Sequence, residues 1–547
     1  MKVADFFCGA GGFSEGFRQK GFDVVFALDN WQPAVDTHKL NHPDCKNIKM
    51  DILELNTPEK IDAVVPDTEV IIGSPPCVAF SGSNKAGKAD KSLGIRLIES
   101  FLRVIAWKKS KGVLKYWVLE NVPNSKDYIK DEYTWKELGL PGKGPKLTVE
   151  RRFILNAADF GSPQTRERFF CGDFPKPVET HKSSWVTMAE VLDSLTNPLD
   201  EKKDAQIRDP VYGFTIPKPR LTDHFYDSRV AEHEWKNAKR MKADHPVYGR
   251  MTFPEDVDRP SRTVMATMSA STREAIIFEA FDDKSKHAGY RMPTIREIAT
   301  FMTFPITYQF EAGSEGGKYR LVGNAVCCKQ AAAIAEAMML NEGLNPPKSF
   351  IPLPDVRPSV DLNGMKRKMK KEGHKKPDAK FWMHVPHIKF NSIRAHLSNM
   401  DSDFKEGKIR WKSEIRYGPA KGHKVAVIDN ASLEKFMETG EKSTLTLKGK
   451  FKRFKSEISR TFKGKMPDAN TFQKRFCNRQ KRGHTPERVL EKIKNIVDKH
   501  YPERRFQETM LDNSSKMISI EKDKIPVRVL AAAYGCNFII KEINRRA

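Results

Sequence analysis

The chain has 547 residues, of which 39% are hydrophobic and 30% charged, and this balance excludes a disordered protein. No apolar run approaches the roughly 18 residues of a membrane span, and the N-terminus lacks the layout of a signal peptide, so we expect no membrane partner. The eight cysteines show neither a paired framework nor metal-ligand spacing, which predicts a reducing compartment, the cytoplasm, and no metal site.

The positive charge is concentrated in the C-terminal part of the chain. The formal net charge is +25, and residues 351–547 hold 46 Lys and Arg against 23 Asp and Glu. The first 350 residues are therefore nearly balanced. A basic surplus confined to one region predicts contact with a polyanion, although a basic tail that only aids solubility is the alternative.

Residues 1–172 are predicted to alternate between strands and helices. Apolar strands are expected at residues 3–7, 23–28, 70–72 and 116–119, each ending in a turn with glycine or polar residues. This alternation predicts an α/β fold with a doubly wound, mainly parallel sheet.

The alternation fades in residues 174–257, which predicts a small separate domain of irregular or β structure. The helical pattern returns after Arg259, at residues 294–302 and 331–340.

Residues 346–375 are predicted to be a Pro-rich and then basic linker. Beyond it, residues 376–547 are expected to form a basic α+β domain of unknown role. Within that domain, residues 381–428 have a β-rich pattern and residues 486–499 have the pattern of an amphipathic helix.

The first strand ends in a glycine-rich turn, Cys8-Gly9-Ala10-Gly11-Gly12, which a helix-like stretch follows. Glycine lets the backbone approach a ligand, and a helix start offers free N–H groups, so this turn predicts a site for a nucleotide-like cofactor. Asp29 ends the next strand and has the chemistry to bind a ribose diol. Alone this pattern is weak, because such turns occur in many α/β proteins.

Three further motifs follow predicted strands. Cys77 comes after two prolines at one strand end, and Glu120 comes at the next, where ligands of open α/β sheets sit. Arg166 and Arg168 are two residues apart on an extended segment and point to the same face. A buried structural cysteine and a solvated charged strand are the alternatives to a nucleophile and an anion-binding pair.

The order and spacing of these motifs resemble the DNA (cytosine-5) methyltransferase family of bacterial or phage type. The resemblance covers residues 1–342 and is interrupted by a variable segment, residues 174–257. It rests on Phe6-Cys8-Gly9-Ala10-Gly11-Gly12, Asp51-Ile52, Pro75-Pro76-Cys77, Glu120-Asn121-Val122, Gln164-Thr165-Arg166-Glu167-Arg168, Arg259-Pro260-Ser261-Arg262-Thr263-Val264, Thr294-Ile295-Arg296-Glu297 with Phe304-Pro305, and Gly323-Asn324-Ala325-Val326.

The resemblance implies one Rossmann-like methyltransferase domain, formed by residues 1–173 and 258–345. It further implies that this domain transfers a methyl group from S-adenosylmethionine to carbon 5 of a flipped cytosine in duplex DNA. Cys77 is then the thiolate that adds to carbon 6 of the ring, which makes carbon 5 nucleophilic. Glu120 engages ring nitrogen 3 and the exocyclic amine, and a raised pKa would suit that role. Arg168 holds the exocyclic oxygen and Arg166 assists.

The resemblance also implies the residues that hold the cofactor and the DNA. Residues 174–257 stand in the place of the target-recognition domain, and residues 78–85 resemble a mobile loop that closes over DNA. We further expect a monomer that acts in the bacterial cytoplasm or nucleoid, with a cognate restriction endonuclease as a partner. The cofactor residues implied are Phe6, Gly9, Gly11, Asp29, Asn30, Asp51, Ile52 and Asn324.

Two features of the chain depart from the family pattern. Cys327 and Cys328 stand where the family has two prolines, which predicts a local change or, alternatively, a redox role. The C-terminal region has no place in the minimal family; it is expected to add DNA affinity, and a fused nuclease is the sharper alternative. For the whole chain, a related transferase acting on tRNA and a DNA-binding regulator without catalysis also stay open.

Overall fold

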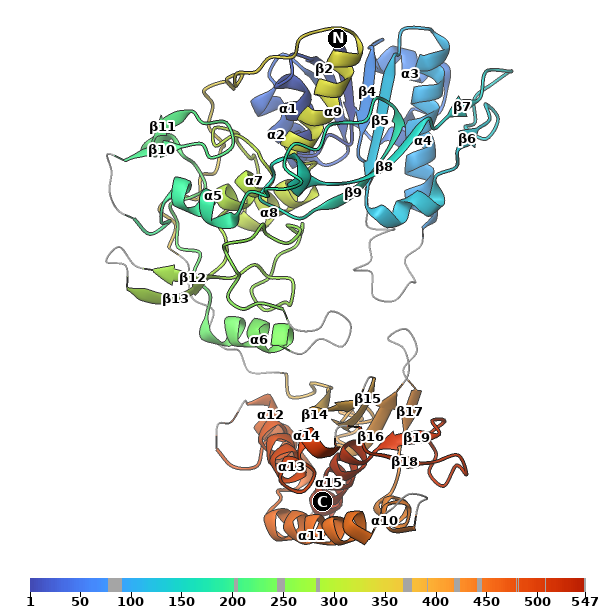
Figure 1. Ribbon diagram of the computed structural model, residues 1–547, viewed down its shortest axis with the longest axis vertical. Coiled ribbons are helices and arrows are strands. Elements are labelled where there is room, and N and C mark those ends of the chain that lie inside the picture. Colours follow the sequence, from blue (N-terminus) through green and yellow to red (C-terminus); the bar gives the residue numbers. More distant parts are fainter. Residues whose placement is uncertain are drawn as a thin grey trace. The chain divides into compact units, whose positions relative to one another are not determined.

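The computed structural model describes residues 1–76, 91–200, 205–243, 251–281, 286–366, 376–390, 392–417, 424–439, 445–478, 480, 482–506 and 508–545 (Figure 1). The chain divides into two compact units. Among the described residues, the first unit holds those up to 366 and the second those from 376 onward. Each unit is therefore treated by itself.

A seven-stranded sheet organises the first unit, in the order β3-β2-β1-β4-β5-β9-β8. The first five strands of this order pair in parallel, while β9 is antiparallel to both β5 and β8. The strands are β1 (Lys2–Phe6), β2 (Asp23–Asp29), β3 (Lys46–Lys49), β4 (Val70–Gly73), β5 (Tyr116–Asn121), β8 (Arg151–Asn156) and β9 (Glu167–Asp173). The predicted mainly parallel sheet is confirmed, with an antiparallel hairpin at one edge.

Helices cover both faces of this sheet, which confirms the doubly wound arrangement. One core packs α4 against side chains such as Phe6 and Trp117, and the other packs α1 and α9 against side chains such as Val70 and Phe170. Figure 1 shows α1 and α9 together on one side and α3 and α4 on the other. The helices are α1 (Gly12–Arg18), α2 (Gln32–Asn41), α3 (Pro58–Val64), α4 (Ser92–Ser110) and α9 (Cys328–Asn341).

The remainder of the first unit contains short elements around a third core. That core joins side chains of residues 188–230 to side chains of residues 264–325, so the variable segment packs with the chain that follows it. Its elements are α5 (Met188–Leu195), β10 (Gln206–Arg208), β11 (Thr215–Pro217), α6 (Glu232–Ala243), β12 (Phe278–Phe281), β13 (His287–Arg291), α7 (Ile295–Phe301) and α8 (Glu315–Asn324). A two-stranded pair, β6 (Glu132–Tyr133) and β7 (Leu147–Thr148), leaves the main sheet after β5.

The second unit is an α+β body with one continuous core. Its four-stranded antiparallel sheet is β14 (Trp382–Phe390), β15 (Ile393–Ser398), β16 (Lys412–Tyr417) and β17 (Lys424–Ala426), so the predicted β-rich stretch is confirmed. The predicted amphipathic helix is α13 (Pro486–His500), which begins after the N-cap Thr485. The other elements are α10 (Asn430–Thr439), α11 (Leu445–Phe462), α12 (Ala469–Cys477), α14 (Glu503–Phe506), β18 (Met510–Asp512), β19 (Lys524–Pro526) and α15 (Val527–Asn544).

None of the described helices is both long and apolar enough to cross a membrane.

Candidate active site

The turns that follow β1, β4 and β5 are joined by hydrogen bonds at one edge of the sheet. The backbone N–H of Ser74 donates to the carbonyl of Phe6 at 3.2 Å, which links the end of β4 to the end of β1. The side-chain amide of Asn121 donates to the carbonyl of Pro75 at 2.9 Å, which links the end of β5 to the turn before Cys77. The structure therefore brings the glycine turn, the proline turn and the Glu120 strand end together, as parallel strands require.

Glu120 is buried at this edge and faces one arginine. Its side chain is only 8% exposed, and its carboxylate lies 3.1 Å from Nε of Arg168. Burial raises the pKa of Glu120, while Arg168 and then Arg166 oppose that rise. The carboxyl is therefore easier to protonate than an exposed glutamate, which is what a proton-sharing role needs.

Arg168 and Arg166 have different surroundings, although they are two residues apart. Arg168 contacts the Glu120 carboxylate, and its side chain is 13% exposed. Arg166 is buried, and its guanidinium donates to the carbonyls of Val264, Gly323 and Ala325 at 3.0–3.1 Å. These contacts indicate that Arg166 ties its own segment to two others, at residue 264 and at residues 323–325, whereas Arg168 faces the Glu120 carboxylate.

The residues on both sides of this arginine pair tie the same segments together. The side-chain oxygen of Gln164 accepts from the backbone N–H of Val264 at 2.8 Å, and the N–H of Thr165 donates to the carbonyl of Ser261 at 2.8 Å. Hydrogen bonds thus hold the motif at residues 164–168 against the motif at residues 259–264.

The glycine turn has the left-handed backbone that glycine favours. Gly9 has φ 52° and Gly11 has φ 87°. A Cβ atom on Gly11 would lie 2.4 Å from the hydroxyl of Tyr308, whereas one on Gly9 would meet nothing closer than 3.9 Å. Gly11 is therefore required by packing, and the space beside Gly9 is left for a ligand.

The acidic residues predicted for the cofactor have unequal settings. The carboxylate of Asp29 accepts from the backbone N–H of Gly9 at 3.0 Å and of Trp31 at 2.9 Å, and burial raises its pKa. Asn30 beside it is exposed. Asp51 caps the short 3₁₀ helix Ile52–Glu54 and accepts from the N–H of Leu53 at 3.0 Å.

Phe6 and Ile52 are buried in the core beneath the edge, and Asn324 is exposed at the end of α8. Gly323, which precedes Asn324, is closely packed, because a Cβ at Gly323 would lie 2.5 Å from the backbone of Met265 and Ala266. Cys77 and the predicted loop at residues 78–85 lie outside the described residues, so their roles stay predictions.

A buried polar network behind the glycine turn was not predicted. The Ser14 hydroxyl donates to the carboxylate of Asp5 at 2.7 Å, and Nε2 of His38 lies 2.9 Å from the same hydroxyl. The hydroxyl of Tyr308 donates to the carbonyl of Ala10, inside the turn, at 2.5 Å. Burial raises the pKa of Asp5 to about 7. Its members come from β1, α1, α2 and residue 308, so no short motif could reveal it.

Asn121 was also missed, although it belongs to a motif that the sequence singled out. Only the glutamate of that motif was given a role. Burial of the asparagine, 1% exposed, together with its bond to Pro75, shows that it holds the turn that leads to Cys77.

Cys327 and Cys328 begin α9 in the place of the family's two prolines. Both are free thiols, both side chains are fully buried, and burial raises the pKa of each. Reactive cysteines need an accessible thiolate, so these surroundings favour packing over the redox alternative.

Five basic residues of the variable segment, residues 174–257, lie in ion pairs or on an exposed helix face. Arg220 pairs with Asp355, and Arg229 pairs with Asp227. Lys236, Lys239 and Arg240 are exposed on α6. A buried ion pair of 2.6 Å between Lys242 and Glu255 anchors the end of this helix.

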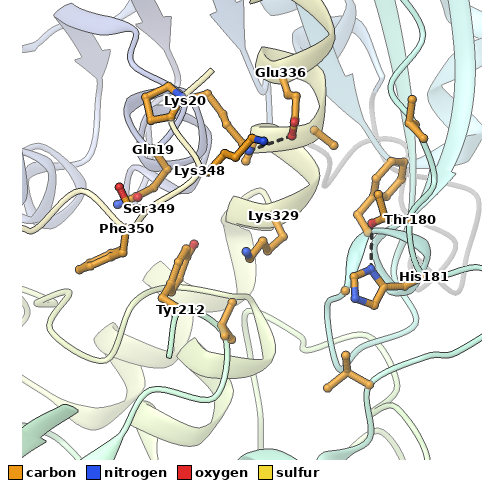
Figure 2. A pocket seen from close by; sticks show the side chains of 18 of the residues that line it. Gln19, Lys20, Thr180, His181, Tyr212, Lys329, Glu336, Lys348, Ser349 and Phe350 are labelled. Carbon is orange, nitrogen blue, oxygen red and sulfur yellow. Dashed lines mark hydrogen bonds and ion pairs between the residues drawn. The ribbon is translucent and has the colours of Figure 1, made fainter. Parts of the chain in front are cut away.

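A cavity of about 500 Å³ lies elsewhere in the first unit, between α9, the C-terminal end of α1 and residues 347–350 (Figure 2). Its wall includes Lys20, which pairs with Glu336, and Lys329, whose ammonium lies 4.7 Å from the ring centroid of Tyr212. None of the predicted catalytic or cofactor residues lines it. It is distinct from the site at the strand ends.

Comparisons with known proteins identify the family of this chain. The sequence model of the C-5 cytosine-specific DNA methylase family matches residues 1–340. The chain belongs to this family. It is a DNA (cytosine-5-)-methyltransferase, and the family uses S-adenosylmethionine and acts on DNA.

Individual relatives cover the same part of the methyltransferase. The chain is 30% identical over 363 residues to type II methyltransferase M.HgiDI of Herpetosiphon aurantiacus, and the match covers 64% of this chain and 96% of the relative. It is 27% identical to M.DdeI of Desulfomicrobium norvegicum, covering 61% and 88%. A solved putative DNA modification methyltransferase encoded within an E. coli prophage is 20% identical, covering 62% and 99%, with a TM-score of 0.44.

Proposed function

We propose that this methyltransferase methylates carbon 5 of a flipped cytosine in duplex DNA by covalent catalysis at the edge formed by β1, β4 and β5. The observation that carries the proposal is the buried Glu120 carboxyl, which is paired with Arg168. The next residue, Asn121, donates a hydrogen bond to Pro75 in the turn that precedes Cys77. A nucleophile and a proton-sharing acid then meet on one pyrimidine ring.

In this mechanism the thiolate of Cys77 adds to carbon 6 of the cytosine, and the ring becomes nucleophilic at carbon 5. Glu120 holds a proton at ring nitrogen 3, which stabilises the charge that develops during the addition. Arg168 donates to the exocyclic oxygen, and Arg166 keeps the segments around it in place. Once carbon 5 carries the methyl group, a base removes its hydrogen, and the electron pair of that bond re-forms the double bond to carbon 6 as the thiolate of Cys77 leaves.

The residues around the glycine turn fit S-adenosylmethionine, which supplies an electrophilic methyl group when it is bound. Gly9 leaves open space beside a backbone that no side chain blocks, and Asp29 has a buried carboxylate with lone pairs left for a ribose. Phe6, Gly11, Asn30, Asp51, Ile52 and Asn324 complete the proposed cofactor surface. The exposed cations of α6, within the proposed target-recognition region at 174–257, would contact DNA phosphates.

Trapping on DNA tests the mechanism. Duplex DNA with 5-fluorocytosine at the target position should form a covalent complex that survives denaturation, because fluorine blocks release of the thiol. Cys77→Ala should abolish the complex, and a transferred tritium label should be found in duplex DNA but not in tRNA. A complex that persists in Cys77→Ala, or labelling of tRNA alone, would rule the proposal out.

The names of the relatives favour a restriction–modification setting, because M.HgiDI and M.DdeI are both type II methyltransferases. We propose a cognate endonuclease as partner, a monomer as the active form and the bacterial cytoplasm as the place of action. Bisulfite sequencing of DNA from cells that express this chain would give the methylated site. Digestion of that DNA by an endonuclease of the same specificity should then fail.

A further inference from the structure

The four-stranded sheet of the second unit has two faces of opposite character. Helices α13 and α15 pack on it, and the core side chains Val385, Leu397 and Ile415 lie on the face toward them. Figure 1 shows these helices together on one side of the strands. The strand register places a different set on the other face, the Trp382–Arg416 face: Trp382, His384, Lys389, Arg394, His396, Ser398, Lys412, Glu414 and Arg416.

The aromatic side chain of Trp382 and the cationic side chain of Arg416 cover a row of polar residues on this face. His384, His396 and Glu414 are directly opposite one another on three neighbouring strands. His396 is 3% exposed and Glu414 is 2% exposed. The Trp382 ring lies 5.2 Å from the His396 ring, and the Arg416 guanidinium lies 4.5 Å from the Trp382 ring centroid. The row is thus shielded by its neighbours, while Trp382 itself stays 47% exposed.

The buried Glu414 fixes the cations around it. Its carboxylate lies 2.7 Å from the ammonium of Lys412 and 2.8 Å from a guanidinium nitrogen of Arg416. Stacking on Trp382 also fixes the plane of the Arg416 guanidinium. Cations held in this way lose little side-chain entropy when they bind an anion.

Arg394 supplies the second indication of an anion site. It lies directly opposite Arg416 in the sheet register. Its Nη2 atom is enclosed and has no hydrogen-bond partner in the described part of the chain. An enclosed N–H group without an acceptor costs free energy. Because the Arg394 side chain as a whole is only half-buried, it can recover that cost by turning this group towards an anionic oxygen at the surface.

The charge of the face is positive on balance. Arg394, Lys412 and Arg416 stand against two carboxylates among the described residues, Glu414 and Asp401, and Asp401 lies 2.6 Å from the ammonium of Lys412. Burial, and then His384 and Arg416, lower the pKa of His396 to about 3, so its imidazole is neutral at neutral pH. The surplus is therefore carried by the arginines and lysines.

We propose that the Trp382–Arg416 face binds the sugar–phosphate backbone of duplex DNA, with Arg394 and Arg416 donating to phosphate oxygens. Guanidinium groups match phosphate geometry, and the basic residues 351–547 give the region an attractive field for DNA. A duplex fits better than an unpaired strand, because Arg416 already stacks on the Trp382 ring that a base would need. The contact is independent of the residues proposed for methyl transfer.

The test measures fluorescence anisotropy of a labelled duplex of A·T pairs only, which holds no target cytosine, with the full chain. The variant is Arg394→Gln with Arg416→Gln. The matched control is Lys452→Gln with Arg453→Gln, which removes two exposed cations from α11. The sheet variant should bind several-fold more weakly, and its slope of log affinity against log salt should be shallower by about 1.8, at roughly 0.9 per phosphate contact.

The control should keep the wild-type slope. An unchanged slope in the sheet variant, or an equal loss in the control, would overturn the proposal. If the double variant does not fold, Arg416→Lys serves as the test instead. It keeps the charge but loses the planar guanidinium, and it should also weaken binding. Methyl transfer to a cytosine-containing duplex at saturating DNA should persist in the sheet variant, so that a failure of this proposal is distinguishable from a failure of the proposed mechanism.

Discussion

Arg166 and Arg168 are two residues apart in one motif, and the structure predicts that their loss has different consequences. Arg166→Met would remove three hydrogen bonds of 3.0–3.1 Å between a buried guanidinium and the carbonyls of Val264, Gly323 and Ala325. Hydrogen bonds to charged groups contribute about 1.5–3 kcal/mol each, and abandoned buried carbonyls add a penalty. Because such terms are not additive, we expect a total loss of about 3–5 kcal/mol of unfolding free energy.

Arg168→Gln would remove a partly exposed group that contacts Glu120. We expect little loss of stability but a large loss of methyl transfer. Losing the cation should also raise the pKa of Glu120 further, because Arg168 opposes the effect of burial. The limb of the pH–rate profile that reports Glu120 should therefore move to higher pH in any residual activity.

Urea unfolding followed by tryptophan fluorescence, together with tritium transfer to duplex DNA, separates these effects. With slopes of about 1–3 kcal/mol per M, a loss of about 3–5 kcal/mol should move the transition of the first unit down by roughly 1–5 M in Arg166→Met, whereas Arg168→Gln should stay near the wild-type midpoint. Arg166→Lys is the matched control, because it keeps the charge and can satisfy one carbonyl. Equal midpoints for Arg166→Met and wild type would refute the assignment of Arg166 as a positioning residue.

Three other predictions concern the network and turns around the site. Asp5 has a folded pKa of about 7, against 3.8 for a free aspartate, so it contributes stability below pH 4 that is lost as pH rises through 7. Asp5→Asn should flatten this pH dependence and be more stable than wild type at pH 8, by at most roughly 4 kcal/mol in chemical unfolding. Parallel pH profiles of the two proteins would contradict this prediction. Gly11→Ala would place a Cβ 2.4 Å from the Tyr308 hydroxyl and should lower the free energy of unfolding, whereas Gly9→Ala would place its Cβ in the open space proposed for the cofactor and should weaken S-adenosylmethionine binding in calorimetry with a smaller loss of stability; a Gly9→Ala variant with wild-type cofactor affinity would contradict the proposed placement. Asn121→Ala would break the buried bond to Pro75 and should lower kcat for methyl transfer at least ten-fold, as expected for a misplaced Cys77 turn, while cofactor affinity stays near wild type; a normal kcat would exclude this positioning role.

The class of the first unit, and the elements that carry its chemical groups, could be predicted from local patterns in the sequence. The apolar runs before Gly9, Asp29, Pro75 and Glu120 predicted four strand ends, and the parallel sheet brings these ends to one edge because parallel strands all finish on the same side. The raised pKa of Glu120 could be expected in the same way, since a carboxyl at the end of a buried strand is desolvated. The β-rich start of the second unit and its helix α13 also followed from local periodicity.

Which of these residues contact Glu120 and which hold neighbouring chain segments depends on contacts between distant parts of the chain, and it could be seen only in the folded structure. Arg166 and Arg168 have the same side chain and the same local pattern, yet one binds three carbonyls far away in sequence and the other faces Glu120. The Asp5–Ser14–His38 network and the Trp382–Arg416 face are likewise assembled from separate elements. Hydrogen bonds and desolvation depend on three-dimensional neighbours, whereas periodicity and spacing report only neighbours along the chain.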